Sequence, residues 1–218
     1  MICGVDEAGR GPVLGPLVIA GVVFESEDHV RALHVRDSKQ LSPSRRSVLE
    51  KKIKEHALTY EIVVIPAKDI DEMRKSMTLN ELEVYAFAKI IEQLKPSICY
   101  VDAADVNEKR FGSGILSQLT HRPKLISKHK ADDLYPIVGA ASILAKTKRD
   151  EIVASIEQQL QKKLDMPLGS GYPADPLTKA FLSNWVKRYK NLPPHVRHSW
   201  KTAQRLMNSQ HMKSLDDF

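Results

Sequence analysis

Short apolar runs alternate along the chain with longer stretches in which apolar residues recur every three or four positions. The apolar runs predict five strands, at residues 1–5, 17–24, 58–65, 97–101 and 123–127. The first two are rich in Val, Ile and Leu with little alternation, a pattern typical of strands buried on both faces. Because a turn rich in Gly and Pro separates them, we expect these two strands to pair.

Helical periodicity predicts helices at residues 43–57, 66–73, 78–94, 107–119, 134–163 and 176–189. Ser42 and Pro43 are residue types preferred at the N-cap and at the first helical position. A strand pair comes first, and the later strands alternate with helices. The sequence therefore predicts an α/β fold with a mixed, largely buried central sheet flanked by helices.

The length of 218 residues fits one large domain, or one domain with a small C-terminal addition. We predict a sheet-containing domain at residues 1–165. A helical C-terminal extension at residues 166–218 would carry a Gly-rich loop at 168–172 and the tail. Apolar residues make up 42% of the chain and charged residues 28%, which is enough apolar material to bury a core.

Basic residues (33) outnumber acidic ones (27), which gives a net charge of +6. This excess favours a polyanionic partner, although a basic protein without one fits the charge equally well. Cys3 and Cys99 lie in apolar runs without metal-binding spacing, so we expect buried free thiols. Free thiols are typical of a reducing compartment. Acidic residues begin at position 6, where a signal peptide would be apolar, and no apolar run is long enough to span a membrane. These features together predict a cytoplasmic protein.

Acidic residues follow the predicted strands at three places. Asp6 and Glu7 come directly after the first strand, Asp102 follows the fourth, and Asp132 precedes the long helix. Because sites in α/β sheets gather at the carboxyl ends of strands, we expect these carboxylates to converge. Taken alone, Asp132 is better explained as a helix N-cap and Asp102 as a turn residue.

Converging carboxylates repel one another unless cations neutralise them. Mg²⁺ or Mn²⁺ suits oxygen ligands, and no His/Cys cluster points to zinc. A two-metal site of this kind hydrolyses phosphodiesters. A Ser/His/Asp triad and the Lys-Ser/Thr of a phosphate-binding loop are both missing, so neither a triad hydrolase nor a nucleotide triphosphatase is indicated.

Groups suited to a nucleic-acid ligand surround the acidic positions. Gly9, Arg10 and Gly11 form a turn that gives close backbone approach and one guanidinium. Tyr172 follows a Gly-Ser-Gly loop and could stack on a sugar or base, or pack on the protein. Further candidates for phosphate contact are Lys39, Lys130, Lys146 and Arg149, although any single lysine among them is better explained by a solvated surface.

Several motifs together resemble ribonuclease HII, the type 2 ribonuclease H of bacteria and archaea. They are GVDEAGRGPVLGP at 4–16, DSKQL at 37–41, YVD at 100–102, HKAD at 129–132 with YP at 135–136, AASILAK at 140–146 with RD at 149–150, GSGYPADP at 169–176 and SWKT at 199–202. They run in the order of the family and span positions 4–202.

The resemblance implies an RNase H-like fold with a helical C-terminal extension. It implies cleavage of RNA in RNA–DNA hybrids and at single ribonucleotides in duplex DNA, with 5′-phosphate and 3′-hydroxyl products, in replication and ribonucleotide excision repair. By motif position, the metal-binding catalytic residues would be Asp6, Glu7, Asp102 and Asp132. Gly9, Arg10 and Gly11 would sense the ribose 2′-hydroxyl and scissile phosphate, and Tyr172 would pack on the ribonucleotide.

Three other functions remain open at this point. They are a type 3 ribonuclease H acting on hybrids only, a non-catalytic hybrid-binding protein, and a structural α/β domain with a basic face. Type 3 enzymes usually carry an N-terminal extension domain and lack the tyrosine loop. A non-catalytic binder would be expected to lack at least one of the four carboxylates, so the type 2 assignment is preferred.

The tail is similar to the clamp-binding peptide of some archaeal members. Leu215 and Phe218 match its second half, whereas Met212 stands where Gln is expected and only one terminal aromatic is present. A partner sliding clamp and a polar tail without a partner are both compatible with this pattern. We expect a monomer.

Overall fold

The computed structural model describes the backbone of residues 1–35 and 42–215. Lys39 and Phe218 therefore lie outside the described residues. The chain divides into two compact units. The sheet unit consists of Met1–Ala8, Val18–Val64 and Met77–Lys148, and the helical unit of Gly9–Leu17, Ile65–Ser76 and Arg149–Phe218. The predicted domain boundary between residues 165 and 166 stays a prediction.

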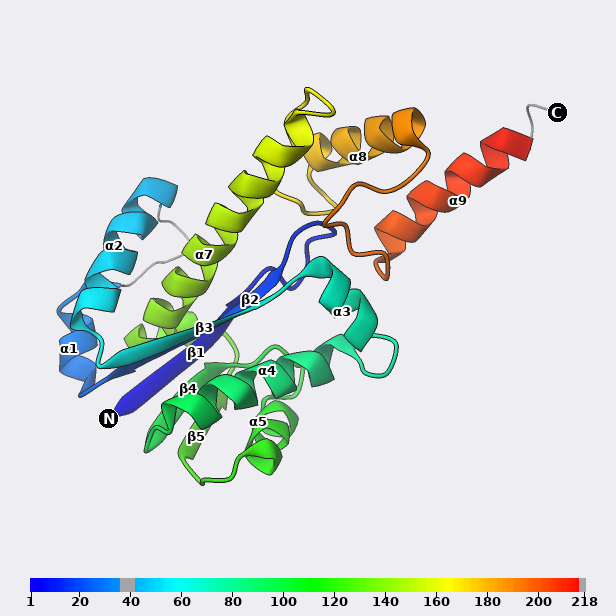
Figure 1. Ribbon diagram of the computed structural model, residues 1–218. Coiled ribbons are helices and arrows are strands. Elements are labelled where there is room, and N and C mark those ends of the chain that lie inside the picture. Colours follow the sequence, from blue (N-terminus) through cyan, green and yellow to red (C-terminus); the bar gives the residue numbers. More distant parts are fainter. Residues whose placement is uncertain (36–41, 216–218) are drawn as a thin grey trace. The chain divides into compact units, whose positions relative to one another are not determined.

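A five-stranded sheet has the order β3-β2-β1-β4-β5 (Figure 1). The strands are β1 (Ile2–Ala8), β2 (Leu17–Phe24), β3 (Thr59–Ile65), β4 (Ile98–Asp102) and β5 (Lys124–Lys128). Strand β1 pairs antiparallel with β2 and parallel with β4, and β4 pairs parallel with β5. The predicted mixed sheet and all five strands are confirmed.

Strand β1 is longer than the apolar run that predicted it. Its ladder with β2 continues through Asp6 and Glu7 to the pair Ala8 and Val18. The prediction that the strand ends at residue 5 was wrong because backbone pairing extends beyond the apolar residues. Asp6 consequently stands on a rigid strand and not in a loop.

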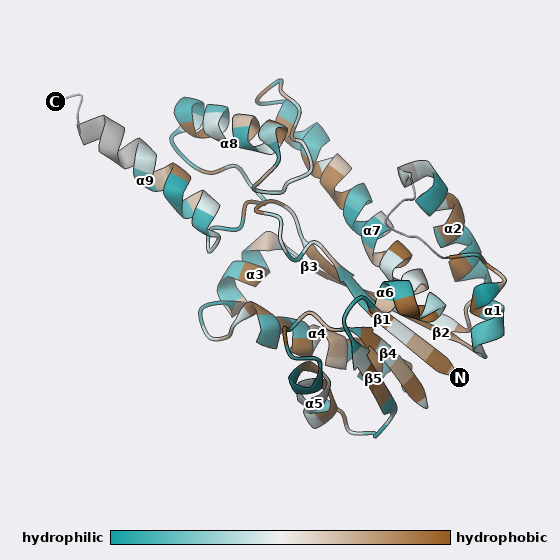
Figure 2. Cartoon of the chain, turned by 180° about the vertical axis from the view of Figure 1, so that it is seen from behind, coloured by the Kyte–Doolittle hydropathy of each residue, from teal (hydrophilic) through white to brown (hydrophobic). Residues whose placement is uncertain are grey.

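Helices cover both faces of this sheet. A Cβ on Gly4 would meet the backbone of Ile137 in α7 (Pro136–Gln161), whereas a Cβ on Gly21 would meet Ile90 in α4 (Leu79–Leu94). Figure 1 shows α4 and α5 (Glu108–Gln118) together, away from α7. The sheet unit also contains α1 (Glu27–Arg31), α2 (Pro43–His56) and α6 (Ala131–Leu134). The apolar sequences of β1, β2 and β4 are visible as brown ribbon in Figure 2.

Capping side chains begin the predicted helices where expected. Ser42 accepts a hydrogen bond from the Arg45 N–H at α2, and Asn107 caps α5 in the same way. Thr78 and Glu81 form a capping box at α4. The predicted helix at 134–163 instead begins at Pro136, after the separate short helix α6 and the extended residue Tyr135.

The helical unit contains α3 (Ala67–Met73), α8 (Pro176–Tyr189), α9 (Lys201–Leu215) and the C-terminal part of α7. Helix α1 and helix α9 were not individually predicted. The core of this unit joins the segment after β1 to α7 and α8, and includes Val13, Leu14, Leu160, Phe181 and Trp185. A strand-like bridge between Leu14 and Val196 ties the same segment to the loop before α9.

Cys3 and Cys99 are free and fully buried, as predicted, and lie opposite each other in the β1–β4 ladder. Burial raises the pKa of Cys99 well above its ordinary value. Among the described residues, no helix has both the length and the apolar character needed to cross a bilayer.

Candidate functional site

A cluster of three carboxylates lies at the carboxyl ends of β1 and β4. One carboxylate oxygen from each of Asp6, Asp102 and Asp132 lies within 4.8 Å of the other two. Asp6 and Asp102 meet because β1 and β4 are parallel neighbours. Asp132 joins them from α6, whose first residue, Ala131, donates its N–H to Asp102 Oδ1 at 3.2 Å. The predicted convergence of these three residues is what the structure shows.

Asp6 is the most buried member of the cluster, with 4% of its surface exposed. Its pKa is raised from 3.8 to about 7, mainly by burial and also by the charges of Asp102 and Asp132, while a hydrogen bond from Ser142 and the charge of Lys146 partly offset the rise. Lys146 Nζ lies 4.0 Å from Asp132 Oδ2. Because neighbouring carboxylates repel one another, the cluster favours additional positive charge beside that of Lys146.

The donor set fits a hard divalent cation. Among the side chains that the structure describes, this is the group of His, Cys, Asp and Glu residues that lie close enough together to hold a metal ion. All its donors are carboxylate oxygens, which suit Mg²⁺ or Mn²⁺ better than zinc. Asp6, Asp102 and Asp132 are therefore the residues that would bind such an ion.

Glu7 is not among the residues whose oxygens lie within 4.8 Å of one another. It follows Asp6 on β1, and side chains of successive strand residues point to opposite faces of the sheet. Its predicted part in metal binding stays a prediction.

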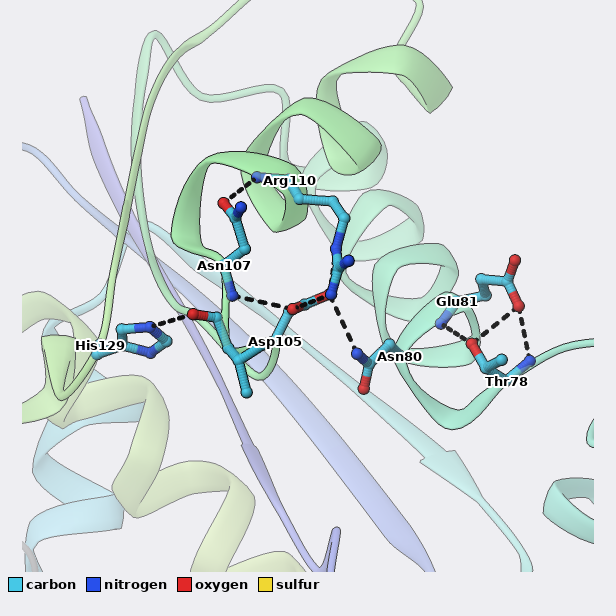
Figure 3. A network of polar contacts seen from close by, with 8 residues as sticks. Thr78, Asn80, Glu81, Asp105, Asn107, Arg110 and His129 are labelled. Atoms are coloured by element: carbon cyan, nitrogen blue, oxygen red, sulfur yellow. Dashed lines mark hydrogen bonds and ion pairs between the residues drawn. The ribbon is translucent and has the colours of Figure 1, made fainter.

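The loop after β4 is held by a polar network around Asp105 (Figure 3). Arg110 donates to both carboxylate oxygens of Asp105, at 2.9 and 2.5 Å, and Asn80 Nδ2 donates at 3.0 Å. The hydrogen bonds from Arg110, followed by that from the Asn107 N–H, lower the pKa of Asp105 to about 2. The carboxylate therefore stays charged at neutral pH, and these contacts anchor the loop three residues after Asp102.

The same loop is tied to the segment that carries Asp132. Glu108 accepts hydrogen bonds from Lys128 Nζ at 3.2 Å and from the His129 N–H at 2.8 Å. The His129 ring lies 3.3 Å from the Val106 carbonyl (Figure 3). These contacts set the spacing between the ends of β4 and β5, and so between two members of the carboxylate cluster.

The raised pKa of Asp6 predicts that the stability of the metal-free protein depends on pH. The unfolded chain releases this proton near 3.8, whereas the folded protein keeps it to about 7. Between these values the folded state binds more protons, so raising the pH favours unfolding. In chelator, the free energy of unfolding should fall by on the order of a few kcal/mol from about pH 4 to above pH 7.

Urea unfolding of the wild type and of Asp6→Asn from about pH 4 to above pH 7 would test this predicted fall in the free energy of unfolding. The difference between the two proteins isolates the contribution of Asp6. Parallel pH profiles would show that the pKa of Asp6 is the same in the folded and unfolded states, contrary to the effect expected from its burial.

The Gly9-Arg10-Gly11 turn belongs to the helical unit. Gly9 has a φ of +91°, and a Cβ there would lie 2.5 Å from the Pro16 carbonyl oxygen. The guanidinium of Arg197 donates to the carbonyl oxygens of Gly9 at 2.6 Å and Arg10 at 3.0 Å. The turn thus depends on the left-handed conformation of Gly9 and on hydrogen bonds from the buried Arg197 guanidinium.

Tyr172 lies on the Gly-rich loop of the same unit, with 43% of its surface exposed. A Cβ on Gly11 would lie 3.4 Å from its ring, and the Arg149 guanidinium lies 5.6 Å from the ring centre. Arg149 also donates to the Ser170 carbonyl at 3.3 Å. The structure therefore brings Gly11, Arg149 and Tyr172 together, as the prediction of a shared site requires.

The remaining basic candidates are placed less specifically. Lys130 precedes α6 in a left-handed conformation with a φ of 54°, and Lys146 lies beside Asp132. Lys39 and Phe218 lie outside the described residues, and Leu215 is the last residue of α9. The roles of these residues in binding stay predictions.

Two residues with contacts to the site had no role assigned from the sequence. Ser142 is fully buried and lowers the pKa of Asp6. Arg197 is fully buried against the Gly9–Arg10 carbonyls. The signal for Arg197 was a basic residue two positions before the SWKT motif, but sequence alone does not distinguish it from a surface arginine.

Comparison with known proteins identifies the family. The family model described as Ribonuclease HII matches residues 3–203. The chain belongs to the ribonuclease HII family. The ribonuclease HII of Methanosarcina barkeri is 45% identical over 216 residues, covering 94% of this chain and 95% of that protein.

Solved structures agree with this assignment. The ribonuclease H2 of Pyrococcus horikoshii superposes with a TM-score of 0.88 at 41% identity, covering 96% of this chain and 98% of that one. The ribonuclease HII in a complex with PCNA from Archaeoglobus fulgidus gives a TM-score of 0.85 at 39% identity, with full coverage of both chains. The predicted RNase H-like fold is confirmed.

Proposed function

We propose that this ribonuclease HII hydrolyses the RNA strand of RNA–DNA hybrids and incises duplex DNA at single ribonucleotides, leaving 5′-phosphate and 3′-hydroxyl ends. Family membership supports the first activity. The observation that carries the chemistry is the convergence of Asp6, Asp102 and Asp132 within 4.8 Å at the end of two parallel strands.

The carboxylates act in this proposal by holding positive charge against a phosphodiester. Divalent Mg²⁺ or Mn²⁺, when bound, activates water for in-line attack and neutralises the leaving 3′ oxygen. Asp6, Asp102 and Asp132 supply the negative charge that binds such ions, and we propose that Glu7 contributes a fourth carboxylate. The polar contacts of Asp105 and Glu108 keep Asp102 and Asp132 at a fixed spacing.

Recognition of ribose is assigned to the Gly9-Arg10-Gly11 turn and to Tyr172. A 2′-hydroxyl both donates and accepts hydrogen bonds, so backbone groups and a tyrosine can distinguish ribose from deoxyribose. Gly11 is exposed beside the Tyr172 ring. We further assign phosphate contacts to Arg10, Lys39, Lys130, Lys146 and Arg149, because a phosphate backbone is bound by dispersed cations.

The defining experiment is cleavage of a labelled DNA duplex with one ribonucleotide, alongside an all-DNA duplex and a long hybrid. Each substrate is incubated with Mg²⁺, with Mn²⁺ and with chelator. We expect metal-dependent incision on the 5′ side of the ribonucleotide and no cleavage of the all-DNA duplex. Cleavage of the hybrid alone would favour a type 3 activity, and binding without cleavage would favour a non-catalytic protein.

Replacing Tyr172 tests its assignment to the ribonucleotide. Tyr172→Ala removes a half-exposed ring, and base or sugar stacking contributes about 1–3 kcal/mol. We expect kcat/KM to fall by at least about tenfold on the single-ribonucleotide duplex and by less on a long hybrid, which offers alternative cleavage positions. Tyr172→Phe separates the ring from the hydroxyl. Equal losses on both substrates would show that the ring only packs against the protein.

Partner and location form the last part of the proposal. The Archaeoglobus fulgidus relative was solved as a complex with PCNA. We infer that the tail containing Leu215 and Phe218 binds a sliding clamp, and that the enzyme is a cytoplasmic monomer serving DNA replication and ribonucleotide excision repair. Co-migration of the full chain with a clamp, compared with a chain truncated after residue 209, would test this inference.

A further inference from the structure

Arg197 is the largest side chain that is fully buried in the described part of the protein. Its guanidinium donates to three backbone carbonyls of the segment between β1 and β2. The acceptors are Gly9 at 2.6 Å from Nη2, Arg10 at 3.0 Å from Nη1 and Gly15 at 2.9 Å from Nε. A buried cation is costly unless it is hydrogen-bonded in this way, so these contacts specify one conformation of the turn.

Trp200 holds the next carbonyl of the same turn. Its indole Nε1 donates to the Gly11 carbonyl at 3.2 Å. The Arg197 guanidinium lies 4.7 Å from the indole ring centre, and that of Arg74 lies 5.3 Å from it. Cation–π contact of this kind orients the ring as well as stabilising it. The carbonyls of three consecutive residues, Gly9, Arg10 and Gly11, are therefore all directed at Arg197 or Trp200.

The segment that carries Arg197 and Trp200 is itself fixed. The Asp71 carboxylate in α3 accepts the His198 N–H at 2.7 Å and the Ser199 N–H at 2.9 Å. The Arg197 N–H donates to the Val13 carbonyl at 2.8 Å. Both partners of the turn thus stand on a segment that is anchored to a helix on one side and to the turn on the other.

Fixed carbonyls determine where the amides of the turn point. In a trans peptide the C=O and the following N–H point in opposite directions. Since the Gly9 and Arg10 carbonyls face Arg197, the N–H groups of Arg10 and Gly11 face away from it. Gly11, unlike Gly9, is exposed. This is the arrangement that a ligand-binding pair of backbone amides requires.

We propose that Arg197, with Trp200, is a positioning residue for ribose recognition: it holds the Gly9-Arg10-Gly11 turn so that its backbone meets the 2′-hydroxyl side of the substrate. The inference rests on the proposed function, because it assigns to that turn a role in selecting ribonucleotides. The hydrogen bonds described for the Arg197 guanidinium all go to backbone carbonyls. The side chain stays charged at neutral pH although burial lowers its pKa to about 9.

Two variants and one control separate positioning from folding. Arg197→Lys keeps the charge but cannot reach three spread carbonyls from one nitrogen. Trp200→Phe keeps the ring against both arginines and removes only the donor to Gly11. Arg74→Met is the matched control, because it removes a cation from the same indole and leaves the turn carbonyls untouched.

The measured quantity is the preference for ribonucleotide-containing DNA, namely the dissociation constant for an all-DNA duplex divided by that for the same duplex with one ribonucleotide. All variants are made in the Asp6→Asn protein, so that the substrate is not cleaved during the measurement. We expect this preference to fall about tenfold in Arg197→Lys and about threefold in Trp200→Phe. Affinity for the all-DNA duplex should stay within about twofold, since dispersed phosphate contacts carry it. Arg74→Met should retain the full preference.

Three outcomes would overturn the proposal. In the first, both variants melt normally and keep the parental preference. In the second, they lose affinity for both duplexes equally together with their melting temperature, which would make Arg197 a folding residue only. In the third, the Asp6→Asn parent shows no preference and the wild type shows no cleavage, and the proposed function then fails as well. The first two outcomes leave the proposed function standing.

Discussion

Replacing Asp6 by Asn should abolish cleavage of every ribonucleotide-containing substrate while the protein stays folded. Asp6 is the buried member of the carboxylate cluster, and its oxygen lies within 4.8 Å of those of Asp102 and Asp132. Asparagine has nearly the same shape but supplies no negative charge to a divalent cation. We expect kcat to fall by about a thousandfold, the upper end of the range found when a group that stabilises transition-state charge is removed.

The fold should tolerate this change because it relieves repulsion. Burial raises the pKa of Asp6 to about 7, so the ionised side chain is unfavourable in the metal-free protein. Thermal melting in chelator should therefore show Asp6→Asn to be at least as stable as the wild type at neutral pH. Mn²⁺ should raise the melting temperature of the wild type and leave that of the variant unchanged, because only the wild type binds it.

Asp133→Asn is the matched control for a carboxylate close to the site. Asp133 follows Asp132 in α6 but is not part of the cluster. This variant should keep both its cleavage rate and its Mn²⁺-dependent rise in melting temperature. An active Asp6→Asn enzyme would remove Asp6 from the mechanism, and a parallel Glu7→Gln variant would show whether Glu7 belongs to it.

The carboxylate cluster could be predicted from the sequence because its logic is local. Asp102 ends an apolar run, and the carboxyl ends of neighbouring parallel strands meet at one edge of a sheet. The adjacency of β1 and β4 was the missing piece, since strand order depends on contacts between residues nearly a hundred positions apart. The start of α7 was missed for another reason, namely that Pro136 begins a new helix after an extended residue.

The support of the Gly9-Arg10-Gly11 turn could not be predicted. Gly9, Arg10 and Gly11 stood out by composition, whereas Arg197 is about 190 residues away along the chain and holds them through backbone carbonyls. Every residue has a backbone carbonyl, so the residue type does not show which carbonyls accept a hydrogen bond from a distant side chain. The members of the carboxylate cluster were thus identifiable from their own side chains, whereas Arg197, which contacts the backbone of residues far away in the sequence, was not.

Gly9→Ala should disable substrate recognition more than a positive φ alone explains. A Cβ on Gly9 would lie 2.5 Å from the Pro16 carbonyl oxygen and 2.7 Å from the Arg149 side chain, at a φ of +91°. Backbone cannot yield as a flexible side chain does, so the turn must move, and a shift of about 1 Å can cost about a hundredfold in rate. We therefore expect kcat/KM on the single-ribonucleotide duplex to fall about a hundredfold.

Gly15→Ala separates the two causes. Gly15 also has a positive φ, +93°, but its Cβ would meet only the end of the Val153 side chain, at 3.3 Å. It therefore incurs the backbone cost of about 1–2 kcal/mol without the collision. The left-handed conformation should lower the free energy of unfolding by a similar amount in both variants. Overpacking should lower it further in Gly9→Ala alone. Steady-state cleavage and urea unfolding of the pair measure the two effects. If Gly9→Ala cleaves as well as Gly15→Ala, then close packing around Gly9 does not set the position of the turn, and the backbone of Gly9-Arg10-Gly11 is not what reads the ribose.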